Sequence, residues 1–429
     1  MCGGSDLTIK KQIRFFRPLG FSFFLFLVDF FLVSEIIFIP GLRVQDIAAL
    51  IAVIFVMPII NEIDTDSRLK RVTSFITIYF YYLTISNLFF MIKHDLWIRH
   101  IFYVLKELEF IIAFFLTVWV VKNRPFLVTN LTKWFVIVNV FYGLYQVLTG
   151  QISYYGIRSI VSFAPSVSGN VFFVSMVVMF LFYLYHKKIS FIVWSFLCML
   201  LTVFTVSKTY IVLIAIFFIT FYLLEAMMKL LHKRTLTPRG ILLVSLIVVC
   251  ILLFTLFSQN LTEYVEMLIE DSVFFSRVIY RMSLFGYSAD FRASKTTRYY
   301  KTFIDDNIGI LLFGQGKGTP EQYLGVTTLG VDNQYLRSLI EMGIIGITLW
   351  GLIILMVLAS LSKQKSVTKV NAFLAVLISY LAASVGTEVF QTTHPGFAFW
   401  FLAGVIYAAP MSASVGATRL SDDNVNGSI

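Results

Sequence analysis

Two arginines in this sequence stand at the same distance from a glycine, each in a segment between long apolar runs. Arg158 is followed eleven residues later by Gly169, and Arg298 is followed at the same spacing by Gly309. A guanidinium group is planar, always charged and able to form bidentate hydrogen bonds with phosphate oxygens. Each such charge-assisted bond contributes roughly 1.5–3 kcal/mol. The pair therefore indicates a site for a phosphate-bearing lipid, with the two glycines as structural residues.

A second arginine pair strengthens this interpretation. Arg277 and Arg281 lie four residues apart in the mostly apolar stretch SVFFSRVIYRMSLFG, so a helix would present both on one face. Such a helix would lie at the membrane interface and direct both guanidinium groups the same way. Two or three arginines could hold a diphosphate without a metal and stabilise it as it leaves. The alternative is that a long loop simply tolerates these charges.

Two shorter motifs each allow a structural and a functional interpretation. Lys208 lies in a hairpin, TVSKTY, between two apolar runs, where it would anchor the membrane interface or add positive charge to the same pocket. Gly314, Gly316 and Gly318 alternate in FGQGKG and permit a tight turn or a nest for an anion. The spacing of a nucleotide-binding P-loop is absent.

The run VDNQYLRSLIEMGIIG combines a helix start with ionisable residues. Asp332 and Asn333 precede it, and either could cap the helix, while Asp332 could instead serve as a general base. Glu341 follows Asn333 by about two helical turns and enters an apolar run. A carboxylate there needs a partner, and Arg337, four residues earlier, is the expected one. Tyr335 of the same run is a further candidate for substrate contact.

These residues must be positioned by a helical membrane framework. The chain has 429 residues, of which 58% are hydrophobic and only 14% charged, a composition unlike that of soluble proteins. Its apolar runs have the length that crosses a hydrocarbon core of about 30 Å. Helices are expected because lipid cannot satisfy free backbone amides. We predict an all-α, polytopic membrane protein with about twelve transmembrane helices, near residues 18–39, 44–60, 72–92, 101–121, 131–149, 169–185, 189–206, 209–226, 241–257, 343–361, 370–390 and 396–412.

Lysine and arginine set the orientation of these spans, because they concentrate in cytoplasmic loops. They gather before the first span and after each even-numbered one, so we expect both termini in the cytoplasm and Arg158 on the outward side. We predict one polytopic membrane domain over residues 1–429, with the first helix as its own insertion signal. Residues 258–342 form a large outward loop, and residues 411–429 form a disordered cytoplasmic tail.

Other chemistry finds little support in the sequence. The three cysteines, Cys2, Cys198 and Cys250, form no disulfide or metal cluster by their positions, and no nucleic-acid motif is present. We predict no metal and no cofactor. Glu388 and His394, which flank the last outward loop, are additional candidates.

Together these motifs resemble a known family, the Wzy-type O-antigen or capsule polymerases of the O-antigen ligase/polymerase superfamily. Four features carry the resemblance: one large outward loop late in the chain, the R-x10-G pair, the S-K-T hairpin at Ser207–Thr209, and DNQYLRSLIEMGIIG. The last resembles the superfamily signature [HD]-N-x-x-L-x(4)-E-x-G. The resemblance covers roughly residues 100–410.

The resemblance implies a GT-C-like fold in the bacterial cytoplasmic (inner) membrane and a metal-independent glycosyltransferase with its active site facing the periplasm or outside. Its donor would be a polyprenyl-diphosphate-linked oligosaccharide, embedded among membrane lipids, with a chain-length regulator and a flippase as partners. The short helices of such enzymes would lie in the large outward loop. By this carry-over Asp332, Arg298 and Glu341 would be catalytic. The residues that would bind diphosphate or glycan are Arg158, Lys208, Arg277, Arg281, Arg298, Asn333, Tyr335 and Arg337.

Three alternatives stay open. Another enzyme of the superfamily would be a ligase that moves finished glycan to a lipid A core, or a transferase that decorates a protein or teichoic acid. O-antigen ligases usually have histidine where Asp332 stands. A transporter or flippase would show inverted repeats or broken helices at the membrane midplane, neither of which is evident in the sequence. A structural assembly partner would leave the arginines least explained.

Overall fold

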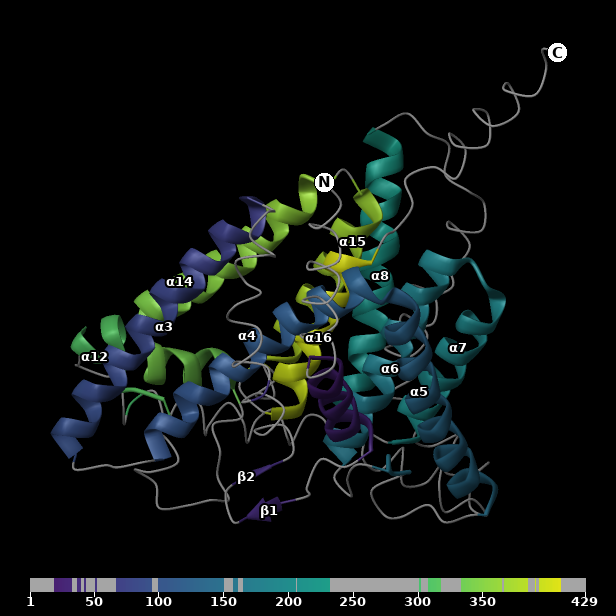
Figure 1. Cartoon of the computed structure of the whole chain (residues 1–429), viewed down its shortest axis with the longest axis horizontal. Helices are drawn as coiled ribbons and strands as arrows, with labels where there is room; N and C mark the ends of the chain where they lie inside the picture. Colours follow the sequence, from purple (N-terminus) through teal and green to yellow (C-terminus); the bar gives the residue numbers. More distant parts are fainter. Residues whose placement is uncertain are drawn as a thin grey trace, which may run out of the picture.

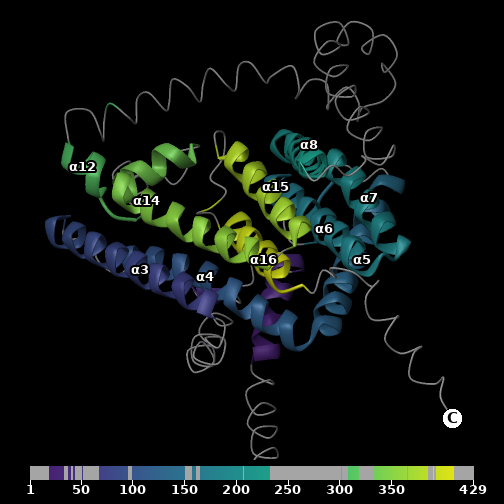
Figure 2. The same ribbon diagram turned by 90° about the horizontal axis from the view of Figure 1, so that it is seen from above.

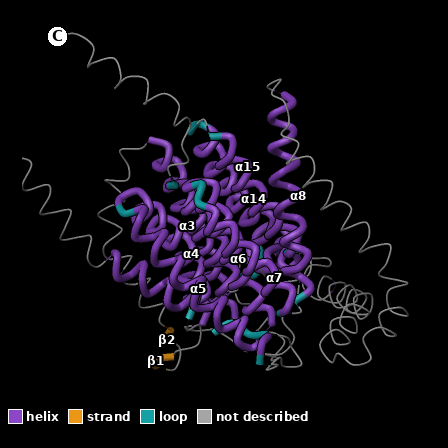
Figure 3. Tube along the Cα trace, turned by 90° about the vertical axis from the view of Figure 1, so that its right-hand side faces the viewer, coloured by secondary structure: helices purple, strands orange, loops and turns teal. Residues whose placement is uncertain are grey.

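The computed structural model of this chain is almost entirely helical over the residues it describes. Those residues are 19–32, 37–39, 42–43, 51, 67–94, 99–149, 157–160, 165–205, 207–231, 301, 308–317, 333–364, 366–384, 390 and 393–409. One short antiparallel pair, β1 (Ile37–Ile39) and β2 (Leu42–Arg43), interrupts the helical pattern. Figure 3 shows this pair at one end of the helical bundle.

Long apolar helices dominate the described part of the chain. Five of them contain segments that are long and apolar enough to cross a membrane, and four shorter apolar helices accompany them. By length and composition the chain is therefore a helical membrane protein. The helices are residues 19–31, α3 (Ser67–His94), α4 (Arg99–Asn123), α5 (Pro125–Leu148), α6 (Pro165–His186), α7 (Ile189–Phe204), α8 (Lys208–Leu231), α12 (Ile308–Phe313), α14 (Gln334–Ser362), α15 (Val367–Ala383) and α16 (Thr393–Ala408).

The helices form two flanks around a central pair. α3 lies beside α14 and α12 on one flank, while α5, α6, α7 and α8 form the other (Figures 1 and 2). α4 packs against α16 between the flanks, and α15 packs against α8. The core between these helices is rich in phenylalanine, whose rings stack or meet edge to face, as do Phe173 and Phe217.

Ten of the twelve predicted spans coincide with helices, and the other two, 44–60 and 241–257, lie almost wholly outside the described residues. The prediction for residues 18–39 was wrong in its last part, since the helix ends at Phe31 and Ile37–Ile39 form β1. β-branched isoleucines before the Pro-Gly pair at positions 40 and 41 favour a strand and turn there. The span predicted to end at residue 390 also ends earlier, with Ser384 as the C-cap of α15.

α14 is broken near its start, which the sequence prediction did not foresee. Gly343 has φ 62° and ψ −177°, a conformation available in practice only to glycine. The break separates a short arm, residues 334–342, from a long arm, residues 344–362. The short arm falls within the segment predicted as the end of the outward loop. At about 1.5 Å per residue, the long arm alone is enough to cross a core of roughly 30 Å.

Candidate functional site

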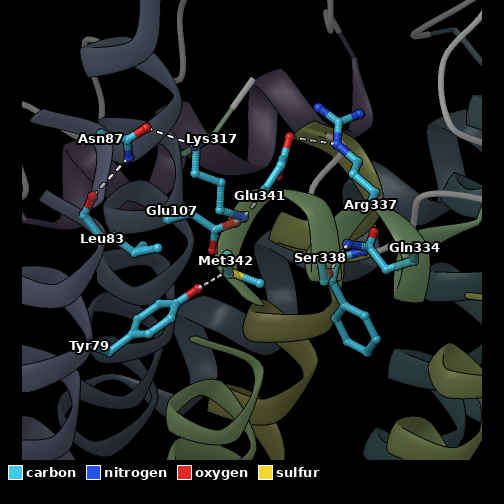
Figure 4. A network of polar contacts seen from close by, with 11 residues as sticks. Tyr79, Leu83, Asn87, Glu107, Lys317, Gln334, Arg337, Ser338, Glu341 and Met342 are labelled. Atoms are coloured by element: carbon cyan, nitrogen blue, oxygen red, sulfur yellow. Dashed lines mark hydrogen bonds and ion pairs between the residues drawn. The ribbon is translucent and has the colours of Figure 1, made fainter. Parts of the chain in front are cut away.

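Four buried ionisable side chains meet where the short arm of α14 faces α3 and α4 (Figure 4). The Lys317 ammonium lies 2.6 Å from Glu107 Oε1 and 3.6 Å from Glu341 Oε2. On the other side, Arg337 Nε donates to Glu341 Oε1 at 3.0 Å. Every one of these side chains is at least nine-tenths buried. We call these four residues the charge cluster.

The charge cluster is balanced, with two cations against two carboxylates. A buried charge is tolerated only when it is paired, because removal from water costs several kcal/mol per ion. Glu341 is the centre of the arrangement, since each of its oxygens faces a different cation. The predicted Arg337–Glu341 pair is confirmed. The long-range partners Lys317 and Glu107 were not selected from the sequence.

The glycine-containing turn after α12 closes the break in α14. Breaking the helix at Gly343 removes amide partners from the carbonyls just before it, and buried carbonyls require replacements. The amide of Gln315 donates to the Ile340 carbonyl at 2.7 Å, and the amide of Gly316 donates to the Glu341 carbonyl at 2.9 Å. Tyr82 donates its hydroxyl to the Met342 carbonyl at 2.7 Å.

This turn is therefore a structural clamp and not an anion nest. The next amide, that of Lys317, donates to the Asn87 side-chain oxygen at 2.7 Å, so three successive amides point to protein acceptors. Gly314 and Gly316 both have positive φ. A Cβ on Gly314 would lie 2.5 Å from the Glu341 carbonyl carbon, so glycine is needed for the close approach. Gly318, the third of the alternating glycines, lies outside the described residues.

The start of the short arm is fixed by hydrogen bonds to the end of α15. Of the two predicted cap candidates, Asp332 and Asn333, Asn333 caps α14 by accepting from the Leu336 amide at 3.1 Å. The Gln334 amide donates to the Ser384 carbonyl at 3.0 Å. Tyr335 donates its hydroxyl to the Leu381 carbonyl at 2.7 Å. The arm that carries the signature residues is thus held at both ends, by α15 and by the charge cluster.

The Arg158 segment is held by side chains of the helices on either side of it. The Gln146 amide group forms two hydrogen bonds with the backbone of Arg158, donating to its carbonyl at 2.8 Å and accepting from its N–H at 2.9 Å. The Ser159 amide donates to Ser168 Oγ at 2.9 Å. These contacts fix the position of the Arg158 backbone between α5 and α6.

Gly169, the glycine paired with Arg158, allows α6 to approach the S-K-T hairpin. A Cβ at this position would lie 2.7 Å from the Tyr210 ring and 3.0 Å from Ser207 Cβ. This contact supports the structural role predicted for Gly169 and brings two of the sequence motifs side by side. Lys208 begins α8, but its side chain lies outside the described residues.

An aromatic bridge connects the Gly169 region with the start of α14. Tyr380 of α15 packs with Phe173 of α6 at a ring separation of 6.3 Å, and with Phe390 at 5.8 Å. Phe173 also packs with Tyr210 at 6.1 Å. The Phe390 amide, in turn, lies 3.3 Å from the Gln334 side-chain oxygen that accepts from it. Both motif regions therefore lie at the same end of the bundle, which we call the predicted outer end.

Several predicted site residues lie outside the described part of the chain: Asp332, Arg277, Arg281, Arg298 and Glu388. Gly309 lies exposed in α12. His394 lies in the first turn of α16, with its side chain undescribed. The sequence interpretation missed Glu107 and Lys317. Each is a charged residue beside an apolar run and therefore needs a buried partner, and Lys106 and Glu109, next to Glu107, carry the same signal.

Comparison with known proteins adds no family assignment. No protein-family model matches the chain, and no curated protein matches it. The site combines a fixed arginine segment, a capped and anchored helix arm, and a carboxylate between two cations.

Proposed function

We propose that this protein is a glycosyltransferase that joins polyprenyl-diphosphate-linked oligosaccharide units into O-antigen or capsular polysaccharide at the outer face of the bacterial cytoplasmic membrane. Support comes from the R-x10-G, S-K-T and DNQYLR motifs, which resemble those of Wzy-type polymerases. Three of these segments, around Arg158, Ser207 and Gln334, lie at one end of the helical bundle.

The break in α14 is the observation that carries the proposal. It leaves a complete span in residues 344–362 and turns the signature residues into a separate arm at the end of that span. A substrate with a membrane-embedded polyprenyl tail and a water-exposed glycan would present its diphosphate at this depth. The short arm and the Arg158 segment are both fixed there, as preorganised binding of a transferring group requires.

The proposed reaction is a displacement at the anomeric carbon of the donor glycan. An acceptor hydroxyl forms a new C–O bond at that carbon while the bond to the polyprenyl diphosphate breaks, and the diphosphate leaves as an anion. Arg158 and Arg298 would hold the diphosphate, and Asp332 would take the hydroxyl proton. Glu341 faces cations through both oxygens, so its surroundings favour a positioning role over proton transfer.

A transporter is the second candidate, because the break in α14 is a feature that transporters share. In transporters, however, broken helices place their binding site near the membrane midplane. In this chain a full-length span follows the break, so the buried charges lie at the end of the span. This placement favours transfer chemistry at the membrane surface over passage through the membrane.

The test uses the purified full chain with one polyprenyl-diphosphate-linked repeat unit in the presence of EDTA, with products separated on a glycan gel. A ladder of lengthening products would support a metal-independent polymerase. Product that forms only after addition of a lipid A core acceptor would indicate a ligase. Absence of product with either acceptor, together with movement of labelled lipid across liposomes, would refute the enzyme proposal and favour a flippase.

A further inference from the structure

Two buried polar side chains at the predicted outer end have no hydrogen-bond partner within the part of the chain that the structure describes. Asn170, in α6, is 0% exposed, and neither its amide nitrogen nor its amide oxygen is paired. Tyr380, in α15, is also 0% exposed, and its hydroxyl is unpaired. A buried polar group without a partner destabilises a fold, and such groups are rare in proteins. These two groups therefore indicate a role other than stability.

Asn170 lies beside the segment that carries Arg158. The Ser159 amide donates to Ser168 Oγ at 2.9 Å, and both of these serines are buried. Ser168 lies two residues before Asn170, within the same turn of α6. The hydrogen bond that fixes the Arg158 segment on α6 therefore ends on the helical turn that carries the unpaired amide.

Tyr380 reaches the same region from the side of α14. Phe173, three residues after Asn170, shares a face of α6 with it. The ring of Phe173 packs with that of Tyr380 at a separation of 6.3 Å. Tyr380 also packs with Phe390, whose amide donates to the side chain of the first residue of α14. The two unpaired groups therefore lie between the Arg158 segment and the short arm of α14, the two parts of the proposed site.

These groups lie along a seam between two pairs of helices. α6 packs mainly against α7, and α15 packs mainly against α8 (Figure 2). Closure of the seam removes the Asn170 amide and the Tyr380 hydroxyl from water without giving either one a partner in return. This loss offsets part of the gain from apolar packing, so it lowers the free energy needed to open the seam at this end. A polar group that entered and paired with both side chains would stabilise the open seam.

The chemistry of the two side chains specifies the group that would pair with them. An asparagine amide offers a donor nitrogen and an acceptor oxygen, and a tyrosine hydroxyl both donates and accepts. An ionised diphosphate offers only acceptors, so it would leave the Asn170 oxygen unpaired. A sugar hydroxyl donates and accepts, and two neighbouring hydroxyls match both polar atoms of one amide. The pair therefore suits a sugar better than a phosphate.

We propose that Asn170 and Tyr380 bind hydroxyl groups of the sugar attached directly to the diphosphate, when the seam between α6 and α15 opens at the outer end. The inference rests on the proposed function, in which Arg158 holds the diphosphate. Because the Arg158 segment is bonded to the turn of α6 that carries Asn170, the first sugar beyond the diphosphate is the one within reach. The two side chains then select substrates by the hydroxyl groups of that sugar.

The test measures the binding of two lipids to the full chain in a neutral detergent by native mass spectrometry. One lipid is the polyprenyl-diphosphate-linked repeat unit, and the other is polyprenyl diphosphate without sugar. The variants are Asn170→Leu, which keeps the branched shape of the side chain, and Tyr380→Phe, which removes only the hydroxyl. The matched controls are Asn371→Leu, buried at the opposite end of α15, and Tyr222→Phe, toward the far end of α8. The melting temperature of each variant is recorded as well.

We expect each site variant to bind the repeat unit about fivefold more weakly, the effect of one hydrogen bond, and to bind the sugar-free lipid as the original chain does. The melting temperature of each site variant should be unchanged or higher, because an apolar group replaces an unpaired polar one. The two control variants should bind both lipids as the original chain does.

Unchanged binding of the repeat unit in both site variants would overturn the inference and leave the proposed function standing. A lower melting temperature at unchanged affinity would also overturn it, since the two groups would then be structural and paired with buried water. If the original chain binds neither lipid, the proposed function fails and the inference fails with it. If Asn170→Leu does not fold, Tyr380→Phe decides the test.

Discussion

Replacing Lys317 by methionine should destabilise the protein strongly, because it leaves the charge cluster with one cation and two carboxylates. Lys317 is the shared partner of Glu107 and Glu341, at 2.6 and 3.6 Å. Removing one partner of a buried ion pair costs about 3–5 kcal/mol, because the remaining charge stays buried without compensation. Methionine keeps the length and apolar stem of the lysine, so the loss reports on the charge.

A double-mutant cycle isolates the electrostatic part of this loss. Combining Lys317→Met with Glu107→Gln restores neutrality, with Arg337 and Glu341 still paired at 3.0 Å. The double variant should therefore lose at least about 1 kcal/mol less than the sum of the two single variants. The free energy of unfolding is measured by SDS titration in mixed micelles, with tryptophan fluorescence as the signal.

Lys301→Met is the matched control, since Lys301 is exposed. It should change the free energy of unfolding by less than about 0.5 kcal/mol. If Lys317→Met loses no more stability than this control, or if the two single losses simply add, the four residues are not a coupled cluster. The account of how the short arm is held would then be wrong.

Three other substitutions, two of them with a control variant, test the local geometry in the same unfolding assay. Gly343→Ala should cost at least about 1–3 kcal/mol, because its φ of 62° combined with a ψ of −177° suits only glycine and a Cβ would press on the Leu312 carbonyl. Gly351→Ala, in the same helix with open space around it, should be neutral or stabilising. If Gly343→Ala and Gly351→Ala lose the same stability, the backbone of Gly343 does not require glycine. Asn333→Ala should cost about 1 kcal/mol through loss of the helix cap, whereas Asn333→Asp keeps the cap and should cost little. An equal loss of stability in both variants would argue against capping. Gly169→Ala should cost about 1–3 kcal/mol by overpacking against the hairpin, and full tolerance would mean that α6 is free to shift.

Local sequence patterns were sufficient to predict most of the described helices and the contacts within a single helix. The length and apolarity of the runs predicted ten spans that coincide with helices of the structure. The four-residue spacing of Arg337 and Glu341 predicted their pairing. Residue type and position also predicted a helix cap at Asp332 or Asn333, and Asn333 is the residue that forms it. Each of these features depends on residues close together in the sequence.

Long-range features were missed because the sequence alone does not specify which apolar helices are neighbours. Glu107 and Lys317 are separated by 210 positions, and nothing local indicates that they meet. The break at Gly343 depends on amides from the turn after α12, which replace the lost helical partners. A glycine inside an apolar run is a weak signal by itself, since most such glycines leave the helix intact.

The most direct test of the central claim is the rate of glycan-ladder formation by Arg158→Ala, compared with the original chain and with Arg71→Ala. The Arg71 control removes an exposed arginine at the opposite end of the bundle. Loss of one charge-assisted contact of roughly 1.5–3 kcal/mol predicts a rate about ten- to a hundredfold lower for Arg158→Ala, at unchanged protein yield. Arg71→Ala should keep the original rate. A ladder that forms equally fast in all three proteins would contradict a diphosphate site at Arg158.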